Sequence, residues 1–123
     1  METFLRNIHA VGPAISAVTA SELLHGIKRA VDPVIKARRA SKVEGVLTSV
    51  KLLPFDIAEA RVHARIRAQL EKAGRLIGPH DLLIAATALT AGFDLATLNV
   101  DEFKRVPGLS VIDASAFRVE VKR

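Results

Sequence analysis

The chain of 123 residues has no cysteine, no tryptophan and no tyrosine, and phenylalanine occurs only five times. The absence of cysteine excludes disulfides, thiolate zinc sites and thiol catalysis, so a bound metal would be held by oxygen or imidazole. The shortage of aromatic side chains excludes the base-stacking platform of single-strand-binding folds. No apolar run approaches the ~20 residues that span a bilayer, and the N-terminal residues do not resemble a signal peptide. We therefore expect a cytoplasmic protein without membrane contact.

Apolar residues make up half of the chain, and 18 basic residues against 13 acidic ones give a net charge of +5. This length and apolar content predict a single domain over residues 1–123 with a core of its own. The positive charge favours a polyanionic partner. A second interpretation stays open, because the cluster of Lys36, Arg38, Arg39 and Lys42 also fits the solvated face of a helix.

Residues 77–89 form the stretch around which the rest of the chain is organised. Gly78 and Pro79 predict the start of a helix, since proline is tolerated in the first turn. Asp81 is then the one carboxylate at the mouth of a helix that is otherwise almost entirely apolar. Small residues follow it at helical spacing: Ala85, Ala88 and Gly92. We expect this helix to be buried on more than one side, with another backbone packed close to the small residues.

Short strands alternate with helices along the rest of the chain. We expect a helix at residues 1–9, a strand at 14–18, a helix from Thr19, a helix at about 34–50, a helix from Asp56 to about Ala73, a strand at 93–98, a helical turn at 100–104 and a strand at 109–112. In the helix from Asp56, the residues expected to face the core are Ile57, Ala60, Ala64, Ile66 and Leu70. The alternation predicts an α/β fold with a mostly parallel sheet, whose functional crevice lies beyond the carboxyl ends of the strands.

Three acid-bearing junctions fall at that edge of the predicted sheet. They are Glu22 after the first strand, Asp81 in the apolar helix, and the loop with Asn99, Asp101 and Glu102. Converging oxygen ligands suit a hard divalent cation, Mg²⁺ or Mn²⁺, and two such ions can activate water and stabilise the leaving oxygen of a phosphodiester. Without a cation, the carboxylates would repel and raise one another's pKa.

Helix capping explains each junction separately. Three pairs match the cap-x-x-Glu box, which is worth on the order of 1 kcal/mol: Thr19 with Glu22, Asp56 with Glu59, and Asn99 with Glu102. Asp81 could likewise only complement the helix dipole. We assign Asp56 and Glu59 as caps, and the metal interpretation of the other acids rests on their joint placement.

Four segments, in order and spacing, resemble the VapC-type toxins of the PIN-domain family: residues 14–26, 53–56, 77–86 and 96–109. The resemblance implies a three-layer α/β domain and a small metal-dependent endoribonuclease that hydrolyses RNA, is inhibited by a VapB-type antitoxin and is usually a homodimer. It also implies the catalytic and metal-binding residues. Glu22 matches the family's second acid, Asp81 its third and Asn99 its fourth position, with Asp101 and Glu102 as assisting residues.

The N-terminal residues depart from the family pattern. The family begins with a central strand that ends in a Leu-Asp-Thr-Asn-like motif, whose Asp is the first metal ligand, and no residue before Ala14 matches it. The resemblance therefore implies that the first, central strand is missing, so that the chain is unstable alone or starts further upstream. Two other functions stay open: a catalytically inactive, truncated module that only binds antitoxin or a partner subunit, and a plain structural α/β module.

Other polar residues carry weaker signals. None of the four histidines, His9, His25, His63 and His80, has the spacing of a metal motif, and we expect surface or helix-packing roles for all of them. His80 is the one worth testing for substrate contact, because it adjoins Asp81. Thr97 either hydrogen-bonds a phosphate or a ligand residue, or simply packs in its strand.

Overall fold

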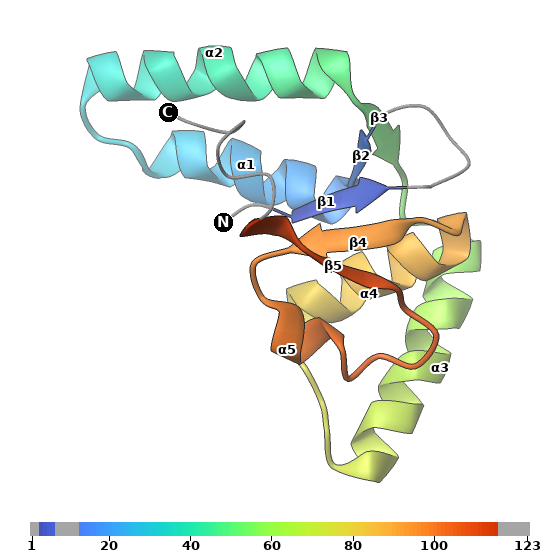
Figure 1. Cartoon of the computed structure of the whole chain (residues 1–123). Coiled ribbons are helices and arrows are strands. Elements are labelled where there is room, and N and C mark those ends of the chain that lie inside the picture. Colours follow the sequence, from blue (N-terminus) through green and yellow to red (C-terminus); the bar gives the residue numbers. More distant parts are fainter. Residues whose placement is uncertain (1–2, 7–12, 116–123) are drawn as a thin grey trace.

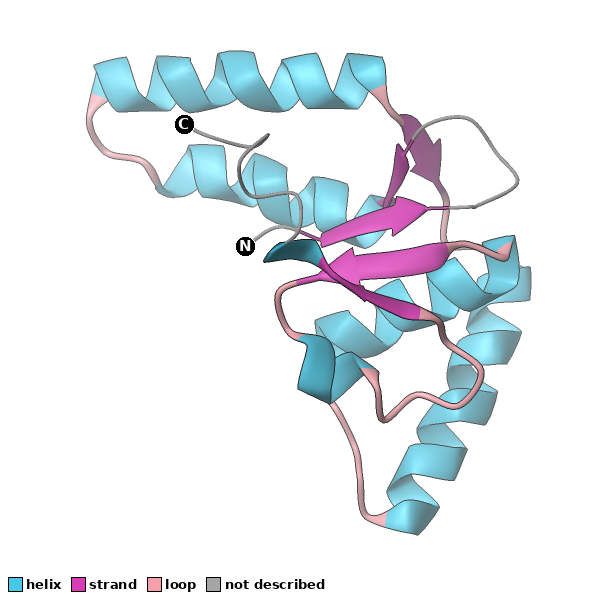
Figure 2. Cartoon of the chain, viewed as in Figure 1, coloured by secondary structure: helices cyan, strands magenta, loops and turns pink. Residues whose placement is uncertain are grey.

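The computed structural model describes residues 3–6 and 13–115. Its elements are β1 (Thr3–Arg6), β2 (Pro13–Ser16), α1 (Ala17–Arg29), α2 (Pro33–Ser49), β3 (Lys51–Leu53), α3 (Ile57–Ala73), α4 (Pro79–Ala91), β4 (Asp94–Thr97), α5 (Val100–Phe103) and β5 (Val111–Asp113). Figure 1 shows α1 and α2 as one antiparallel pair and α3 and α4 as another, with β1, β4 and β5 between the two pairs. The same view coloured by element type shows short strands and long helices (Figure 2). The expected three-layer α/β architecture is confirmed.

The five strands form one sheet in the order β3-β2-β1-β4-β5. The outer pairs, β2 with β3 and β4 with β5, are parallel, whereas β1 is antiparallel to both of its neighbours. Four strands therefore point the same way and only β1 is reversed. This arrangement confirms the predicted mostly parallel sheet and places the carboxyl ends of β2 and β4 at the same edge.

The N-terminal segment corrects two expectations. Residues 3–6 form a strand and not part of a helix, and this strand fills the central position of the sheet that the sequence left without a match. Backbone groups of β2 and β4 explain this outcome, because a gap between them would leave unpaired N–H and C=O groups on both sides. Leu5 is paired with both Ala14 and Leu95 in the observed register. The remaining residues of the expected helix, 1–2 and 7–9, lie outside the described part of the chain.

The core lies between the sheet and the α3–α4 pair. Its members come from strands and helices alike: Ala14, Leu53, Ile66, Leu70, Ile77, Leu82, Ile84, Ala85, Ala86, Ala88, Leu95, Phe103 and Val106. Helix α4 is buried along most of its length, and Ala85 and Ala88 are fully inaccessible, as their small side chains predict. Gly92 instead ends α4 in the left-handed conformation, with a φ of 73°. No helix in the described part of the chain is long and apolar enough to cross a membrane.

The helix boundaries follow the local signals in most places. Asp56 and Glu59 form the predicted capping box of α3, and Gly74 ends that helix with a φ of 67°. The core-facing residues of α3 are only partly as expected: Ile66 and Leu70 are buried, whereas Ile57 is 63% exposed and Ala64 is exposed. The first turn of α3 therefore extends beyond the sheet into solvent.

The predicted capping box of Thr19 and Glu22 is wrong. Ser16 is the N-cap of α1, and its Oγ accepts a hydrogen bond from the Thr19 N–H at 3.0 Å. Ser16 Oγ also donates to Thr19 Oγ1 at 3.1 Å. The helix begins three residues earlier than the box implied, because β2 ends at Ser16 and the chain turns directly into α1. Glu22 is consequently free of a capping role and lies in the second turn.

Candidate active site

Candidate acids from α4 and from the start of α5 lie together in the structure, and Glu22 of α1 lies beside them. Asp81 lies in the first turn of α4, and Asn99 and Glu102 lie at the start of α5, just beyond the carboxyl end of β4. The Asp81 and Glu102 carboxyl groups share a hydrogen bond, and Asn99 Nδ2 donates to Glu102 Oε1. The candidate acid group is thus a contiguous set of side chains and not a series of separate caps.

Glu102 also performs a structural task at this point. Its Oε2 accepts a hydrogen bond from the backbone N–H of Gly78 at 2.7 Å. Gly78 is the N-cap of α4 and has no side chain with which to cap the helix. A Cβ built on Gly78 would lie 3.6 Å from Glu102 Oε2 and 3.8 Å from Asp81 Oδ2, so both carboxyl groups gather around this one position. An anionic oxygen at a helix N-terminus is also favoured by the helix dipole.

The proximity of the carboxyl groups perturbs their protonation. Burial is the largest cause that raises the pKa of Asp81, to about 6, followed by the charge of Glu102, its hydrogen bond and the charge of Glu22. The Gly78 N–H lowers the pKa of Glu102, with help from Asn99 and Asp81. Of the two carboxyl groups, Asp81 is therefore the one that binds a proton first as pH falls. The pair has an excess of negative charge that a cation would relieve.

Glu22 approaches the same group from α1 through a histidine. His80 Nδ1 lies 3.0 Å from Glu22 Oε2, and both side chains are partly open to solvent. Glu22 is close enough to Asp81 for its charge to raise the Asp81 pKa. Asp101 is exposed on α5 and has no side-chain hydrogen bond within the described residues. The structure therefore places Glu22 beside the group formed by Asp81, Asn99 and Glu102, and leaves Asp101 outside it.

Thr97 orders the loop that carries Asn99. The buried Thr97 Oγ1 accepts a hydrogen bond from the Asn99 N–H at 3.0 Å, so its role is to position a site residue. Asn99 itself does not cap α5 with its side chain, although the sequence suggested a box with Glu102. The spacing did indicate a contact between the two residues, but the donor differs from that of a capping box: the Asn99 side-chain amide donates to Glu102, in place of the N-cap backbone N–H.

The carboxylate and amide oxygens of this group suit a hard divalent cation that takes only a few of its ligands from the protein. No three His, Asp or Glu side chains of residues 3–6 and 13–115 are arranged to hold one ion together. Mg²⁺, however, is commonly bound by only one or two carboxylates, with water and substrate phosphates completing its shell. Asp81 and Glu102 supply such a pair, and the Asn99 Oδ1 is left free when Nδ2 donates to Glu102.

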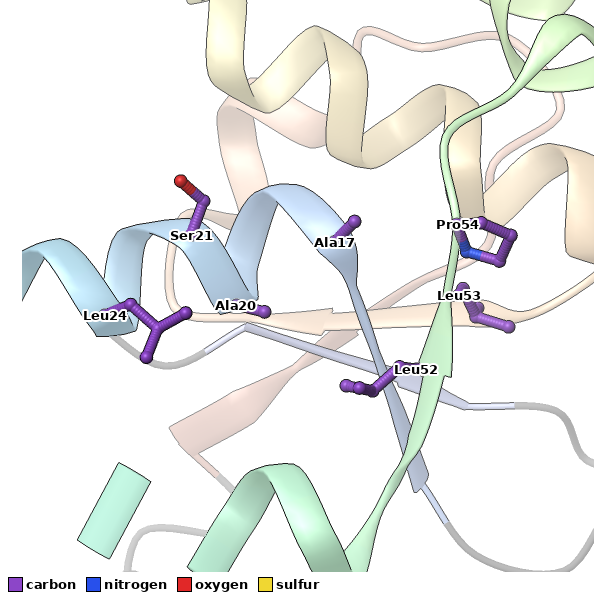
Figure 3. Close-up of a pocket in the computed structure, with 7 residues that line it drawn as sticks. All are labelled: Ala17, Ala20, Ser21, Leu24, Leu52, Leu53 and Pro54. Atoms are coloured by element: carbon purple, nitrogen blue, oxygen red, sulfur yellow. The ribbon is translucent and has the colours of Figure 1, made fainter. Parts of the chain in front are cut away.

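A separate pocket of about 350 Å³ lies between α1 and β3 (Figure 3). Its lining is almost wholly apolar: Ala17, Ala20, Leu24, Leu52, Leu53 and Pro54, with Ser21 as the single polar side chain. Leu52 and Leu24 remain 47% and 39% exposed. No acid and no base line this pocket, and the candidate acids around Asp81 lie outside it.

Two contacts of this group were not predicted from the sequence. Glu102, expected to assist, accepts a hydrogen bond from the Gly78 N–H, and His80, expected to have a surface or helix-packing role, is exposed and contacts Glu22. The Asn-x-x-Glu spacing was the available signal for Glu102. No local spacing could reveal the contact between His80 and Glu22, because these residues are 58 positions apart.

The chain is a small α/β domain with carboxylates gathered where its parallel strands end. The family model of the PIN domain matches residues 1–109. The chain is 42% identical to Ribonuclease VapC1 of Rickettsia felis over 102 residues, covering 83% of this chain and 76% of that protein. It is 33% identical to the tRNA(fMet)-specific endonuclease VapC of Salmonella typhimurium over 107 residues, or 87% and 79% of the two chains. The chain therefore belongs to the PIN-domain family.

Solved structures agree with this assignment. The DNA-bound VapBC structure from Salmonella typhimurium superposes with a TM-score of 0.76 at 34% identity, covering 82% of this chain and 74% of that chain. VapBC-5 from Mycobacterium tuberculosis gives a TM-score of 0.70 at 33% identity, with coverage of 79% and 78%. The resemblance noted in the sequence is confirmed at the level of both family and fold.

Proposed function

We propose that the chain is a metal-dependent endoribonuclease that hydrolyses RNA phosphodiester bonds as the toxin of a VapBC-like toxin–antitoxin system. One observation carries the proposal: the carboxyl groups of Asp81 and Glu102 gather at Gly78 with Asn99 bonded to Glu102, and Glu22 is close enough for its charge to raise the Asp81 pKa. Relatives named as ribonucleases and endonucleases over more than three quarters of this chain support it.

Each residue has a distinct task in the proposed site. Asp81 and Glu102 would hold Mg²⁺ or Mn²⁺, Asn99 would add its amide oxygen, and Glu22 would accept a hydrogen bond from a metal-bound water or hold a second ion. Asp101 stays a prediction for this second role. When bound, the ion supplies an activated water and stabilises charge on the phosphate oxygens. Ionisation of Asp81 is required before the pair can ligate.

One basic group next to the acids, the guanidinium of Arg105, would hold the RNA backbone. Its charge lowers the pKa of Glu102, and its Nη1 donates a hydrogen bond to the Leu76 carbonyl at 3.1 Å. This hydrogen bond fixes the guanidinium at the rim of the site, where a phosphate of the substrate would pass. A positioned arginine suits phosphate recognition because its planar group presents several N–H donors.

The proposed partners follow from the relatives. Their solved structures are of VapBC assemblies, which supports our proposal of a VapB-type antitoxin for this chain. We further propose a homodimer in the cytoplasm, on the basis of the family resemblance of the sequence. Co-expression with the neighbouring small open reading frame tests the first partner. A toxin of this kind would arrest growth when expressed alone and permit growth when its antitoxin is present.

A cleavage assay with a matched control tests the activity. Asp81→Asn removes a ligand charge, whereas Asp94→Asn makes the same chemical change at the opposite end of β4. With Mn²⁺ and RNA, we expect Asp81→Asn to lose roughly 100-fold or more of the cleavage rate and Asp94→Asn to remain close to the parental rate. Equal activity of parental chain and Asp81→Asn would overturn the proposal.

A second function has one observation in its favour. Because β1 is reversed, its carboxyl end at Arg6 lies beside Pro13 and Asp94, at the edge away from the acids. The described residues of the central strand, Thr3–Arg6, include no acid, as in an inactive module that only binds antitoxin or a partner subunit. Absent cleavage by the parental chain, together with retained antitoxin binding, would favour this function.

A purely structural module would show no stabilisation by divalent cations in a thermal melt.

A further inference from the structure

We propose that His80 is a positioning residue, which holds the Glu22 carboxylate in place at the acid site through its Nδ1. The inference rests on the proposed function, since it assigns Glu22 a place in the metal site, and it adds a residue that family resemblance did not supply. His80 acts through Glu22 in this role and does not itself contact metal or RNA.

The hydrogen bond connects two helices that carry different acids. His80 is the second residue of α4 and directly precedes Asp81, whereas Glu22 lies in α1. His80 Nδ1 lies 3.0 Å from Glu22 Oε2. Within the described residues, this is the single side-chain hydrogen bond between α1 and α4. The position of Glu22 relative to Asp81 therefore depends on one ring nitrogen.

Glu22 needs such a partner for two physical reasons. Its side chain is 40% exposed and flexible, so that without a partner it samples many rotamers. Its charge also repels Asp81, which favours rotamers that point away from that carboxyl group. A neutral imidazole that donates from Nδ1 opposes both effects. It leaves Oε1 of Glu22 free to face the ion or its water.

The exposure of His80 makes the inference testable by substitution. Its side chain is 67% exposed, so that replacing it does not disturb the core. His80→Phe keeps a ring of similar shape but removes the donor. His80→Asn is the conservative variant, because its Nδ2 can occupy the position of Nδ1. His25→Phe is the matched control, since His25 is an exposed histidine on the same helix as Glu22.

The experiment measures Mn²⁺ affinity by calorimetry and the kcat and KM of RNA cleavage for each variant. We expect His80→Phe to weaken Mn²⁺ binding and kcat about tenfold, the usual effect of losing an outer-shell partner, with KM for RNA unchanged. His80→Asn should restore most of the loss, and His25→Phe should behave like the parental chain. In the Glu22→Ala background, which lacks the acceptor, His80→Phe should cause no further change, because the interaction that it removes is already gone.

The outcomes separate this inference from the proposed function. If Asp81→Asn keeps full Mn²⁺ affinity, the proposed function fails. If Asp81→Asn abolishes binding while His80→Phe is silent or equally harmful in the Glu22→Ala background, only the positioning role fails. A measurement without metal tests the hydrogen bond directly: ¹⁵N NMR of the neutral imidazole should show an Nδ1–H tautomer for His80 that Glu22→Ala shifts. An unchanged spectrum would overturn the inference.

Discussion

Glu102 on α5 accepts a hydrogen bond at 2.7 Å from the backbone N–H of Gly78, the residue that opens α4. A capping box places a glutamate three residues after the N-cap, whereas here the glutamate comes from a different element. The same carboxyl group contacts Asp81 and Asn99. Helix capping and the candidate metal site therefore depend on one side chain, and the two interpretations of these acids describe the same contact.

Replacing Glu102 should reduce stability as well as activity. Glu102→Ala leaves the Gly78 N–H without its partner and should lower the free energy of unfolding by about 1–2 kcal/mol, measured by urea denaturation without metal. Glu71→Ala is the control, because Glu71 forms only an exposed ion pair with Arg67 and its loss should cost about 0.5 kcal/mol or less. Equal effects of the two substitutions would contradict the capping role.

The stability of the metal-free protein should depend on pH through Asp81. Its pKa rises from 3.8 to about 6 on folding, so the folded state binds more protons than the unfolded state within that window. The contribution of Asp81 to stability is therefore present at low pH and is lost as pH rises through about 6. The lowered pKa of Glu102 acts in the opposite direction, so the comparison must isolate Asp81.

Asp81→Asn provides that comparison. Between about pH 4 and pH 7, in the presence of a chelator, the parental chain should lose stability relative to Asp81→Asn in urea titrations. Mn²⁺ should reduce the loss, because a bound cation stabilises the ionised pair. A stability difference between the two proteins that does not vary with pH would show that Asp81 is not perturbed.

Substitution of Ser16, the N-cap of α1, should reduce the stability of the protein. Ser16→Ala removes the acceptor of the Thr19 N–H and the partner of the Thr19 hydroxyl, and should lower the free energy of unfolding by about 1–2 kcal/mol. Ser21→Ala, an exposed change on the same helix, should have little effect. Thermal unfolding of the two variants measures the difference. If Ser16→Ala proves neutral, Ser16 is not the functional cap.

Phe103 connects the core to the site. It is fully buried on α5, next to Glu102 in sequence, so Phe103→Ala should cost about 3–5 kcal/mol through loss of buried surface and a cavity. Because that loss approaches the stability of a small domain, Phe103→Leu is the informative variant and should cost roughly 1–2 kcal/mol. It should also weaken Mn²⁺ binding, since α5 carries Glu102. Thermal melts with and without Mn²⁺ separate the two effects.

The features predicted correctly from the sequence have local causes. The Asp56–Glu59 box, the end of α3 at Gly74 and the placement of Asp81 in the first turn of α4 each depend on a few consecutive residues. The cap of α1 was misplaced because both Ser16 and Thr19 are good caps. The choice between them is made by the strand, since Ser16 still pairs with Leu53 of β3.

The features that the sequence did not reveal depend on distant residues. The apolar residues of the N-terminal segment fit a helix, but residues 3–6 form the strand that pairs with β2 on one side and β4 on the other. Glu102 and Gly78 are 24 positions apart, and His80 and Glu22 are 58 apart. The order of strands and acids placed Glu22, Asp81 and Asn99 in one region of the fold but wrongly included Asp101, and it did not reveal which hydrogen bonds would join these residues.

The reversed central strand also has a consequence for how the chain folds. β1 pairs on one side with β2, which follows it closely, and on the other with β4, where Thr3 meets Thr97 near the far end of the chain. During synthesis, the first hairpin can form early, but its second edge must wait until β4 leaves the ribosome. Contacts of such long sequence separation slow folding and leave an open strand edge in the interval. A partner that binds the complete sheet can therefore do so only late in translation, after β4 has paired with β1.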